Sequence, residues 1–240
     1  MAKQKRIALA LDGLTFVRAV ELAGRLGRWL CALKLHDLLD AYGPEILTKL
    51  NVPGARNRLW VDYKLHDTKD TVALRVGALV GNGARIITVH ASGGVPMMKA
   101  AVEATRNECG THVAEIYAIT VLTSLDDFEI GRIYGKDRTR EEIVHELALM
   151  AKEAGVRTVV CSAREVGRLK QSPYLKGMRF VVPGTRSVGV ALGQQKRSAT
   201  PAQAIADGAS ELVAGSQVTK ADDPEAAFLA FVKEIDEVLD

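Results

Sequence analysis

The sequence predicts an α/β fold of the (β/α)8 TIM-barrel class, on three observations. Short β-branched runs alternate with longer helical patterns from one end of the chain to the other. Eight such strand–helix units are present, and the length of 240 residues matches the roughly 250 residues typical of this barrel. No low-complexity linker interrupts the series, so residues 1–240 are expected to form a single domain. An open, doubly wound parallel sheet is the main alternative.

The expected strands are eight short apolar runs bounded by glycine, proline or polar residues. In chain order they are RIALALD (6–12), LCALKL (30–35), RLWVDYK (58–64), RIITVH (85–90), EIYAITVLT (115–123), RTVVCS (157–162), RFVVPG (179–184) and ELVAGS (211–216). Apolar residues at helical spacing predict helices at 16–26, near 43–50, and at 71–83, 96–107, 141–155, 163–170, 200–209 and 223–239. Glycine is placed to end three of these helices, at Gly83, Gly155 and Gly208.

Polar residues stand where the expected strands end. Active sites of this barrel class lie on the loops at the carboxyl ends of the strands. An unbroken series of polar strand ends therefore predicts a ring of functional groups around one mouth. From the first strand to the eighth, these residues are Asp12, Lys34, Asp62 with Lys64, His90, Thr123 with Ser124, Ser162, Arg186, and Gly215 with Ser216.

The third expected strand carries the densest charge, in the segment WVDYKLHDTKDTV. Side chains two apart on a strand share a face, so Asp62 and Lys64 are expected to point into the mouth while Tyr63 points outward. Asp67 is expected to begin the next helix, where a carboxylate is favoured. Lys34, from the second strand, then lies on the other side of Asp62 and completes an alternating Lys–Asp–Lys–Asp array.

Such an array has two interpretations. A lysine flanked by carboxylates in a low-dielectric site stays protonated, because nearby opposite charges favour the ammonium form, and it can act as a proton donor. The alternative is a structural ion-pair network at the top of the barrel.

Composition excludes several classes of protein. Hydrophobic residues make up 48% and charged residues 25% of the chain, which is globular composition. The 32 basic and 29 acidic residues are spread along the chain and leave a net charge of +3, so no nucleic-acid partner is expected. Cys31, Cys109 and Cys161 lie far apart, which favours buried thiols in a reducing compartment over disulfides or a zinc site. The apolar run at 7–11 is too short for a membrane span or signal peptide, and the protein is expected to be cytoplasmic.

The segment DYKLHDTKDT resembles the DxKxxD segment of orotidine 5′-monophosphate decarboxylases. Related barrel decarboxylases and aldolases of phosphosugars share DxKxxD, but further segments favour the orotidylate branch. These segments follow in that family's order and spacing, and the resemblance covers nearly the whole chain. They are LALD, ITVHASGG, AITVLTS, VVCSA, VVPGTR, QKRSATP and DGASELVAGSQVTKADDP.

The resemblance implies decarboxylation of orotidine 5′-monophosphate to uridine 5′-monophosphate in pyrimidine nucleotide biosynthesis, without a cofactor or a metal. Asp62 is implied to sit near the substrate carboxylate, and Lys64 to protonate C6 of the pyrimidine as carbon dioxide leaves. Lys34 and Asp67 are implied to complete the charge array.

The resemblance also implies how the nucleotide is held. Asp12 and Lys34 are expected to bind ribose hydroxyls and Thr123 the edge of the pyrimidine. The phosphate end is assigned to Arg186, Gln195, and the backbone at Gly215 and Ser216.

Two segments are implied to close the site. Asp67 and Thr71 are expected to reach into the neighbouring subunit of a homodimer. The long Gly-rich, basic stretch 184–201 is expected to act as a lid that grips an anion.

Three departures from the family pattern fall at the expected pocket. The arginine that usually follows the glycine of the eighth strand is replaced by Ser216, with Gln217 after it. Thr68 stands in place of an isoleucine, and Leu35 with His36 replaces a short pair ending in glycine. Two alternatives therefore stay open: a diverged member that acts on another anionic substrate, and a catalytically silent barrel kept for ligand sensing or subunit interaction.

Overall fold

The computed structural model describes residues 6–50, 58–187 and 199–239. Eight parallel strands pair in chain order, and β8 pairs with β1 to close the barrel, which excludes the open sheet. All eight expected strands are confirmed. They are β1 (Ile7–Ala10), β2 (Ala32–Leu35), β3 (Arg58–Leu65), β4 (Ile86–His90), β5 (Glu115–Ile119), β6 (Thr158–Val160), β7 (Arg179–Pro183) and β8 (Glu211–Ala214).

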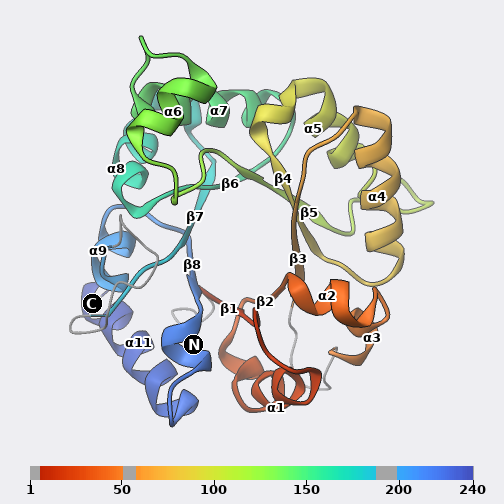
Figure 1. Ribbon diagram of the computed structural model, residues 1–240, viewed down its shortest axis with the longest axis vertical. Coiled ribbons are helices and arrows are strands. Elements are labelled where there is room, and N and C mark those ends of the chain that lie inside the picture. Colours follow the sequence, from red (N-terminus) through yellow and green to blue (C-terminus); the bar gives the residue numbers. More distant parts are fainter. Residues whose placement is uncertain (1–5, 51–57, 188–198, 240) are drawn as a thin grey trace.

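Helices surround the barrel, as Figure 1 shows. The principal ones are α1 (Phe16–Leu26), α4 (Lys69–Gly81), α5 (Gly94–Glu103), α7 (Arg140–Glu153), α8 (Ala163–Gln171), α9 (Pro201–Ala206) and α11 (Pro224–Leu239). The further helices are α2 (Asp37–Tyr42), α3 (Ile46–Lys49), α6 (Asp127–Tyr134) and α10 (Ser216–Thr219). In the described ranges, no helix combines the length and the apolar character that a membrane crossing requires.

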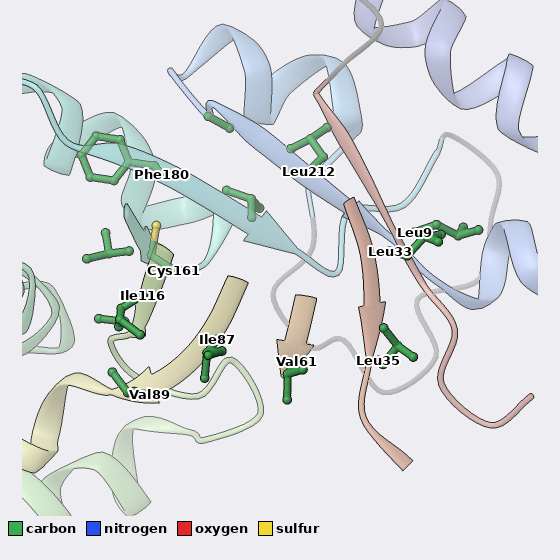
Figure 2. Close-up of a cluster of buried hydrophobic side chains, with 14 of the residues drawn as sticks. Leu9, Leu33, Leu35, Val61, Ile87, Val89, Ile116, Cys161, Phe180 and Leu212 are labelled. Carbon is green, nitrogen blue, oxygen red and sulfur yellow. The ribbon is translucent and has the colours of Figure 1, made fainter. Parts of the chain in front are cut away.

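The alternation of side chains along each strand builds two cores. Outward-facing residues such as Leu33, Val61 and Ile87 pack between the barrel and the helices (Figure 2). Inward-facing residues fill the barrel itself, where small alanines accompany Trp60 and Tyr117. The indole N–H of Trp60 donates to Thr88 Oγ1 at 2.6 Å, so its polar atom is satisfied inside the barrel. The interior of the barrel is therefore a packed core rather than a pore.

Glycines end three helices as the sequence predicts. Gly83, Gly155 and Gly208 have φ values of +105°, +84° and +107°. This conformation is costly for residues with a Cβ and lets the chain reverse into the next strand. At the other ends, Thr139 and Ser162 begin α7 and α8 with capping boxes. Ser162, one of the polar strand ends, therefore serves as a helix cap.

The structure differs from expectation in a few elements. The short helices α2, α6 and α10 were not expected. The fifth strand ends at Ile119, four residues before the end of the expected run. Thr120 still bonds Val160 O through its backbone, but Leu125 N–H donates to Leu122 O and the chain turns there. Helix α4 begins at Lys69, two residues after Asp67, because the Thr68 side chain accepts from Thr71 N and is the N-cap.

Candidate active site

A cavity of about 290 Å³ opens at the carboxyl ends of the strands. Its floor is apolar and includes Trp60, Ile119 and Val160. Its charged lining comes from separate strands and loops: Asp12 after β1, Lys34 in β2, Asp62 and Lys64 in β3, and Arg186 after β7. The parallel barrel brings these residues together because every strand delivers its carboxyl end to the same face.

Four of the charged groups form a continuous chain of ion pairs. Lys34 Nζ lies 2.8 Å from Asp12 Oδ2 and 3.1 Å from Asp62 Oδ2. Lys64 Nζ lies 2.9 Å from the same Asp62 oxygen. Asp62 is thus shared by two ammonium groups, and the order along the chain of contacts is Asp12, Lys34, Asp62, Lys64.

Burial and charge act in opposite directions on the two central groups. Burial disfavours the Lys34 ammonium, but the charges of Asp62 and Asp12 outweigh it and raise the pKa of Lys34. Burial likewise disfavours the Asp62 carboxylate, but Lys34 and Lys64 outweigh it and lower the pKa of Asp62. Both groups are therefore charged at neutral pH.

Lys64 differs from Lys34 in exposure and in backbone. Its side chain is 33% exposed against 9% for Lys34, and it bonds one carboxylate where Lys34 bonds two. Among the described residues it is the only non-glycine with positive φ, at +50°. An L-residue in this conformation carries about 1–2 kcal/mol of strain.

An irregularity in β3 produces this conformation. Val61 pairs with Ile87 and Leu65 with Val89, so three residues of β3 lie opposite one residue of β4. Bulges of this kind re-aim side chains at the rims of barrels. Tyr63, in the middle of the bulge, faces the outer helices: burial and a hydrogen bond with Asp40 of α2 raise its pKa to about 12. The Arg75 guanidinium of α4 lies 5.7 Å from its ring centroid.

Asp67 and Thr71 lie apart from the array within this chain. Both follow β3, and Asp67 is exposed, with its carboxylate accepting from Thr68 N at 2.6 Å. Thr71 bonds Thr68 through both its backbone N–H and its hydroxyl. In the part of the chain that the structure describes, no ion pair joins Asp67 to Lys64.

The side of the mouth assigned to phosphate is built from β7 and β8. Arg186 and Gly215 both line the cavity, while Ser216 is exposed beside Gly215. The Arg186 N–H donates to Ala199 O at 3.0 Å, which joins the two ends of the long loop. Gln217 Oε1 accepts from Ser187 N at 3.4 Å. Thr123, in the loop after β5, also lines the cavity.

Gln195 and most of the expected lid, residues 188–198, lie outside the described residues. The assignment of these residues stays a prediction.

Two histidines stand beside the array. The rings of His66 and His90 are 5.5 Å apart. Burial, followed by the charges of His66 and Lys64, lowers the pKa of His90, which favours the neutral ring. Within the described ranges, no group of three or more His, Cys, Asp or Glu side chains is arranged to hold a metal ion.

Trp60 is the main pocket residue that the sequence did not indicate. In the sequence it resembles an ordinary aromatic residue of a hydrophobic core, and its residue type alone does not indicate a substrate-binding site. Its position two residues before Asp62 on the same strand does place both side chains on one face. From this spacing, Trp60 could have been predicted to form the floor of the pocket beneath the charged groups.

The fold and the site define a parallel (β/α)8 barrel whose mouth holds alternating lysines and aspartates over an apolar floor. The chain matches the model of the Orotidine 5'-phosphate decarboxylase / HUMPS family over residues 5–231 and belongs to that family.

Relatives and solved structures agree with this assignment. The chain is 39% identical to the orotidine 5'-phosphate decarboxylase of Hahella chejuensis, over 97% of this chain and 98% of the relative. It is 38% identical to that of Thermobifida fusca, over 95% of both chains. The crystal structure of orotidine 5'-phosphate decarboxylase from Lactobacillus acidophilus is similar with a TM-score of 0.77 and 31% identity, covering 96% of this chain and 99% of that one.

Proposed function

We propose that this chain is a carbon–carbon lyase that decarboxylates orotidine 5′-monophosphate to uridine 5′-monophosphate, a step of pyrimidine nucleotide biosynthesis. The observation that carries the proposal is the chain of ion pairs from Asp12 to Lys64 at the mouth of the barrel. Family membership supplies the substrate, because the relatives cited above are named for this activity.

The two lysines have different parts in this proposal. Lys34 is buried between two carboxylates and has a raised pKa, so it retains its proton and is suited to binding a ribose hydroxyl together with Asp12. Lys64 is more exposed and bonds a single carboxylate, so its ammonium keeps N–H donors available for a substrate. We assign the proton transfer to Lys64 for this reason.

The reaction balances with groups of the protein alone. The bond between C6 and the carboxylate carbon breaks, its electron pair stays on C6, and carbon dioxide leaves. The Lys64 ammonium then gives a proton to C6, and the resulting amine takes a proton from water. Asp62 holds the ammonium in position beforehand, so the positive charge stands beside the developing carbanion without rearrangement.

The nucleotide's polar groups match the remaining residues. We assign the edge of the base to Thr123, which lines the cavity from the loop after β5. Arg186 offers a guanidinium for the phosphate, with Gln195 and the backbone at Gly215 and Ser216 as further contacts. Since Ser216 cannot supply the second guanidinium that is usual in the family, we expect Arg186 to neutralise most of the negative charge of the phosphate.

Turnover of orotidylate by the purified protein tests the proposal directly. The expected result is loss of orotidylate absorbance with formation of uridylate and one equivalent of carbon dioxide. The Arg186→Ala variant should raise the Michaelis constant by at least about tenfold, as expected for a charge-assisted pair. Arg168→Ala, which removes the same side chain from the exposed face of α8, is the matched control. Absence of turnover at high enzyme and substrate concentrations would overturn the proposal.

We further propose a cytoplasmic homodimer in which Asp67 and Thr71 complete the partner's site. Both residues sit on the rim after β3, and the Asp67 carboxylate is exposed rather than tied to the array of its own chain. An exposed acid beside a row of charges is suited to a second chain's Lys64.

Mixing two inactive variants tests this assembly. Lys64→Ala and Asp67→Ala should each be inactive as homodimers, but a hybrid dimer contains one site free of both changes. We expect mixed subunits to regain up to about a quarter of wild-type activity, the statistical share of intact sites for random exchange. The control is the same mixture before exchange. No recovery after demonstrated subunit exchange would mean that each site is built within one chain.

A further inference from the structure

A second and larger cavity lies at the opposite end of the strands from the charged array. Its volume is about 500 Å³, and it is bordered by the residues that begin β4, β5 and β6 and by the connection from α5 to β5. Its apolar wall includes Val102, Ile116 and Val156. Of the residues proposed for decarboxylation, none that the structure describes lines this cavity.

Two guanidinium groups border this cavity. Arg85 precedes Ile87 by two residues and Arg157 precedes Val159 by two, and both of these aliphatic residues belong to the outward-facing core. Alternation therefore directs both arginines away from the barrel axis and into the layer where the cavity lies. Both are exposed, and within the described ranges neither forms an ion pair with a carboxylate.

The one acidic residue of the lining has its charge directed elsewhere. Glu115 precedes Tyr117 by two residues, and Tyr117 belongs to the inward-facing core. The Glu115 carboxylate accordingly forms an ion pair with Arg179, whose guanidinium also bonds Thr158 inside the barrel. Among the lining residues that the structure describes, no carboxylate is thus left facing the positive charge of Arg85 and Arg157.

An imidazole is held at the same cavity in a defined tautomer. The Thr105 hydroxyl donates its single hydrogen to Val102 O at 2.7 Å. Thr105 Oγ1 therefore accepts from His112 Nδ1, at 2.7 Å, and this leaves Nε2 of His112 available to a ligand.

The segment that carries this histidine is well ordered by its own bonds. Arg106 and His112 form a β-bridge, and the Arg106 guanidinium donates to Gly110 O at 2.7 Å. The cavity wall is therefore preformed rather than created by a ligand.

We propose that this cavity is a second binding site, for a phosphorylated small molecule with an apolar body. Arg85 and Arg157 would hold the phosphate through paired N–H donors, and Nε2 of His112 would accept from a hydroxyl or amino group of the ligand. The wall of Val102, Ile116 and Val156 would cover the body of the ligand. The volume falls within the roughly 300–1,000 Å³ usual for small-molecule sites. This proposal does not depend on the activity assigned to the mouth of the barrel.

Titration with adenosine 5′-monophosphate, followed by NMR of the histidine ring protons, tests the site. The His112 resonance is assigned by its loss in His112→Gln, and it reports on this cavity, whereas His66 and His90 report on the mouth. We expect a saturable shift of His112 with a dissociation constant in the millimolar range or tighter. Inorganic phosphate, which lacks the apolar body, and adenosine, which lacks the charge, should each bind at least about tenfold more weakly.

Single variants identify the groups responsible. Arg85→Gln and Arg157→Gln keep most of the side-chain stem and should each weaken adenosine 5′-monophosphate binding about tenfold, as for loss of a charge-assisted bond. Arg168→Gln, on the exposed face of α8 and away from the cavity, should leave it unchanged. The proposal is overturned if His112 shows no saturable shift, if adenosine binds as tightly as its monophosphate, or if all three variants behave like the unmodified protein.

Discussion

The two ends of the barrel both place charged side chains near its axis, but they use them differently. At the amino end, Arg179 contacts Glu211, Glu115 and Thr158, and the Tyr117 hydroxyl donates to Glu211 at 3.1 Å. At the carboxyl end, two lysines share one carboxylate oxygen of Asp62 and border a cavity. Near the axis, the amino end is closed by a cluster in which opposite charges and hydrogen bonds satisfy one another. The carboxyl end leaves an ammonium, that of Lys64, with donor capacity to spare.

This contrast distinguishes charged groups that stabilise the fold from charged groups that can act on a substrate. A buried charge that is fully bonded to its neighbours is costly to disturb and has nothing to offer a substrate. A partly exposed ammonium, fixed by one carboxylate beside an open space, can transfer a proton or stabilise a negative charge. Substitutions at the two ends should accordingly affect different measured quantities.

The largest effect is expected from Lys64→Ala, at the carboxyl end. Turnover should fall by at least about a thousandfold, because a proton donor and a preorganised positive charge are lost together. The melting temperature should stay close to that of the unmodified protein, which circular dichroism would verify. Lys69→Ala, which removes an exposed lysine of the same segment, serves as the control. Retention of most activity in Lys64→Ala would remove this lysine from the mechanism.

At the amino end, Glu211→Gln should change stability and leave turnover per folded molecule unaffected. The substitution keeps the shape of the side chain but removes the negative charge that faces Arg179. Because Arg179 is partly exposed, we expect the free energy of unfolding to fall by only about 2 kcal/mol. Denaturant unfolding and initial rates, measured on the same sample, separate the two effects. If turnover fell while stability was unchanged, the division between the two ends would be wrong.

A smaller gain is expected from Ser216→Arg at the phosphate side of the mouth. A guanidinium beside Gly215 is placed to add paired bonds to the phosphate, which should lower the Michaelis constant for orotidylate about tenfold and tighten uridylate binding. Ser210→Arg, at the opposite end of β8, provides a control for added charge. Unchanged or weaker binding in Ser216→Arg would show that no phosphate is held at this position.

The pH dependence of stability should reveal the coupling of Asp62 to its lysines. The pKa of Asp62 lies below 3.8 in the folded protein, so its stabilising contribution is present above that pH and is lost as the pH falls through the lowered pKa. The pKa of Lys34 lies above 10.5, so its contribution is lost only as the pH rises beyond that value.

Comparison of the unmodified protein with Asp62→Asn measures the acidic limb of this dependence. The unmodified protein should be the more stable of the two near neutral pH, and the difference in unfolding free energy should shrink in acid, where Asp62 is protonated in both the folded and the unfolded state. Urea unfolding across the acidic range gives this difference. A difference that stayed constant down to the lowest pH would argue against the lowered pKa of Asp62.

The strands were predictable because each is a short β-branched run between turn residues, and the helix-ending glycines are local signals. Short helices were harder to predict. Helix α6 has an N-cap, Asp126, but too few turns to show an apolar period, and α10 has only four residues. The end of β5 was placed too late because the apolar residues of the following turn continue the strand pattern.

The candidate site shows a similar limit. Alternation predicted that Asp62 and Lys64 face the same space, and neighbouring strands predicted that Lys34 joins them. The irregular pairing in which three residues of β3 lie opposite one residue of β4 depends on contacts between segments that are distant in the sequence. No local sequence pattern predicts it. The positive φ of Lys64 follows from that pairing and therefore could not be predicted from the sequence. The role of Ser162 as a cap was masked by its position at a strand end.

The conformation of Lys64 also means that selection for stability and selection for activity favour different residues at this position. At φ +50° glycine fits without strain, but glycine carries no ammonium group. A screen for thermal stability alone would therefore favour Lys64→Gly and discard the proposed proton donor in the same step. Libraries of stabilised variants should hold this position fixed and take their gains from the rest of the barrel.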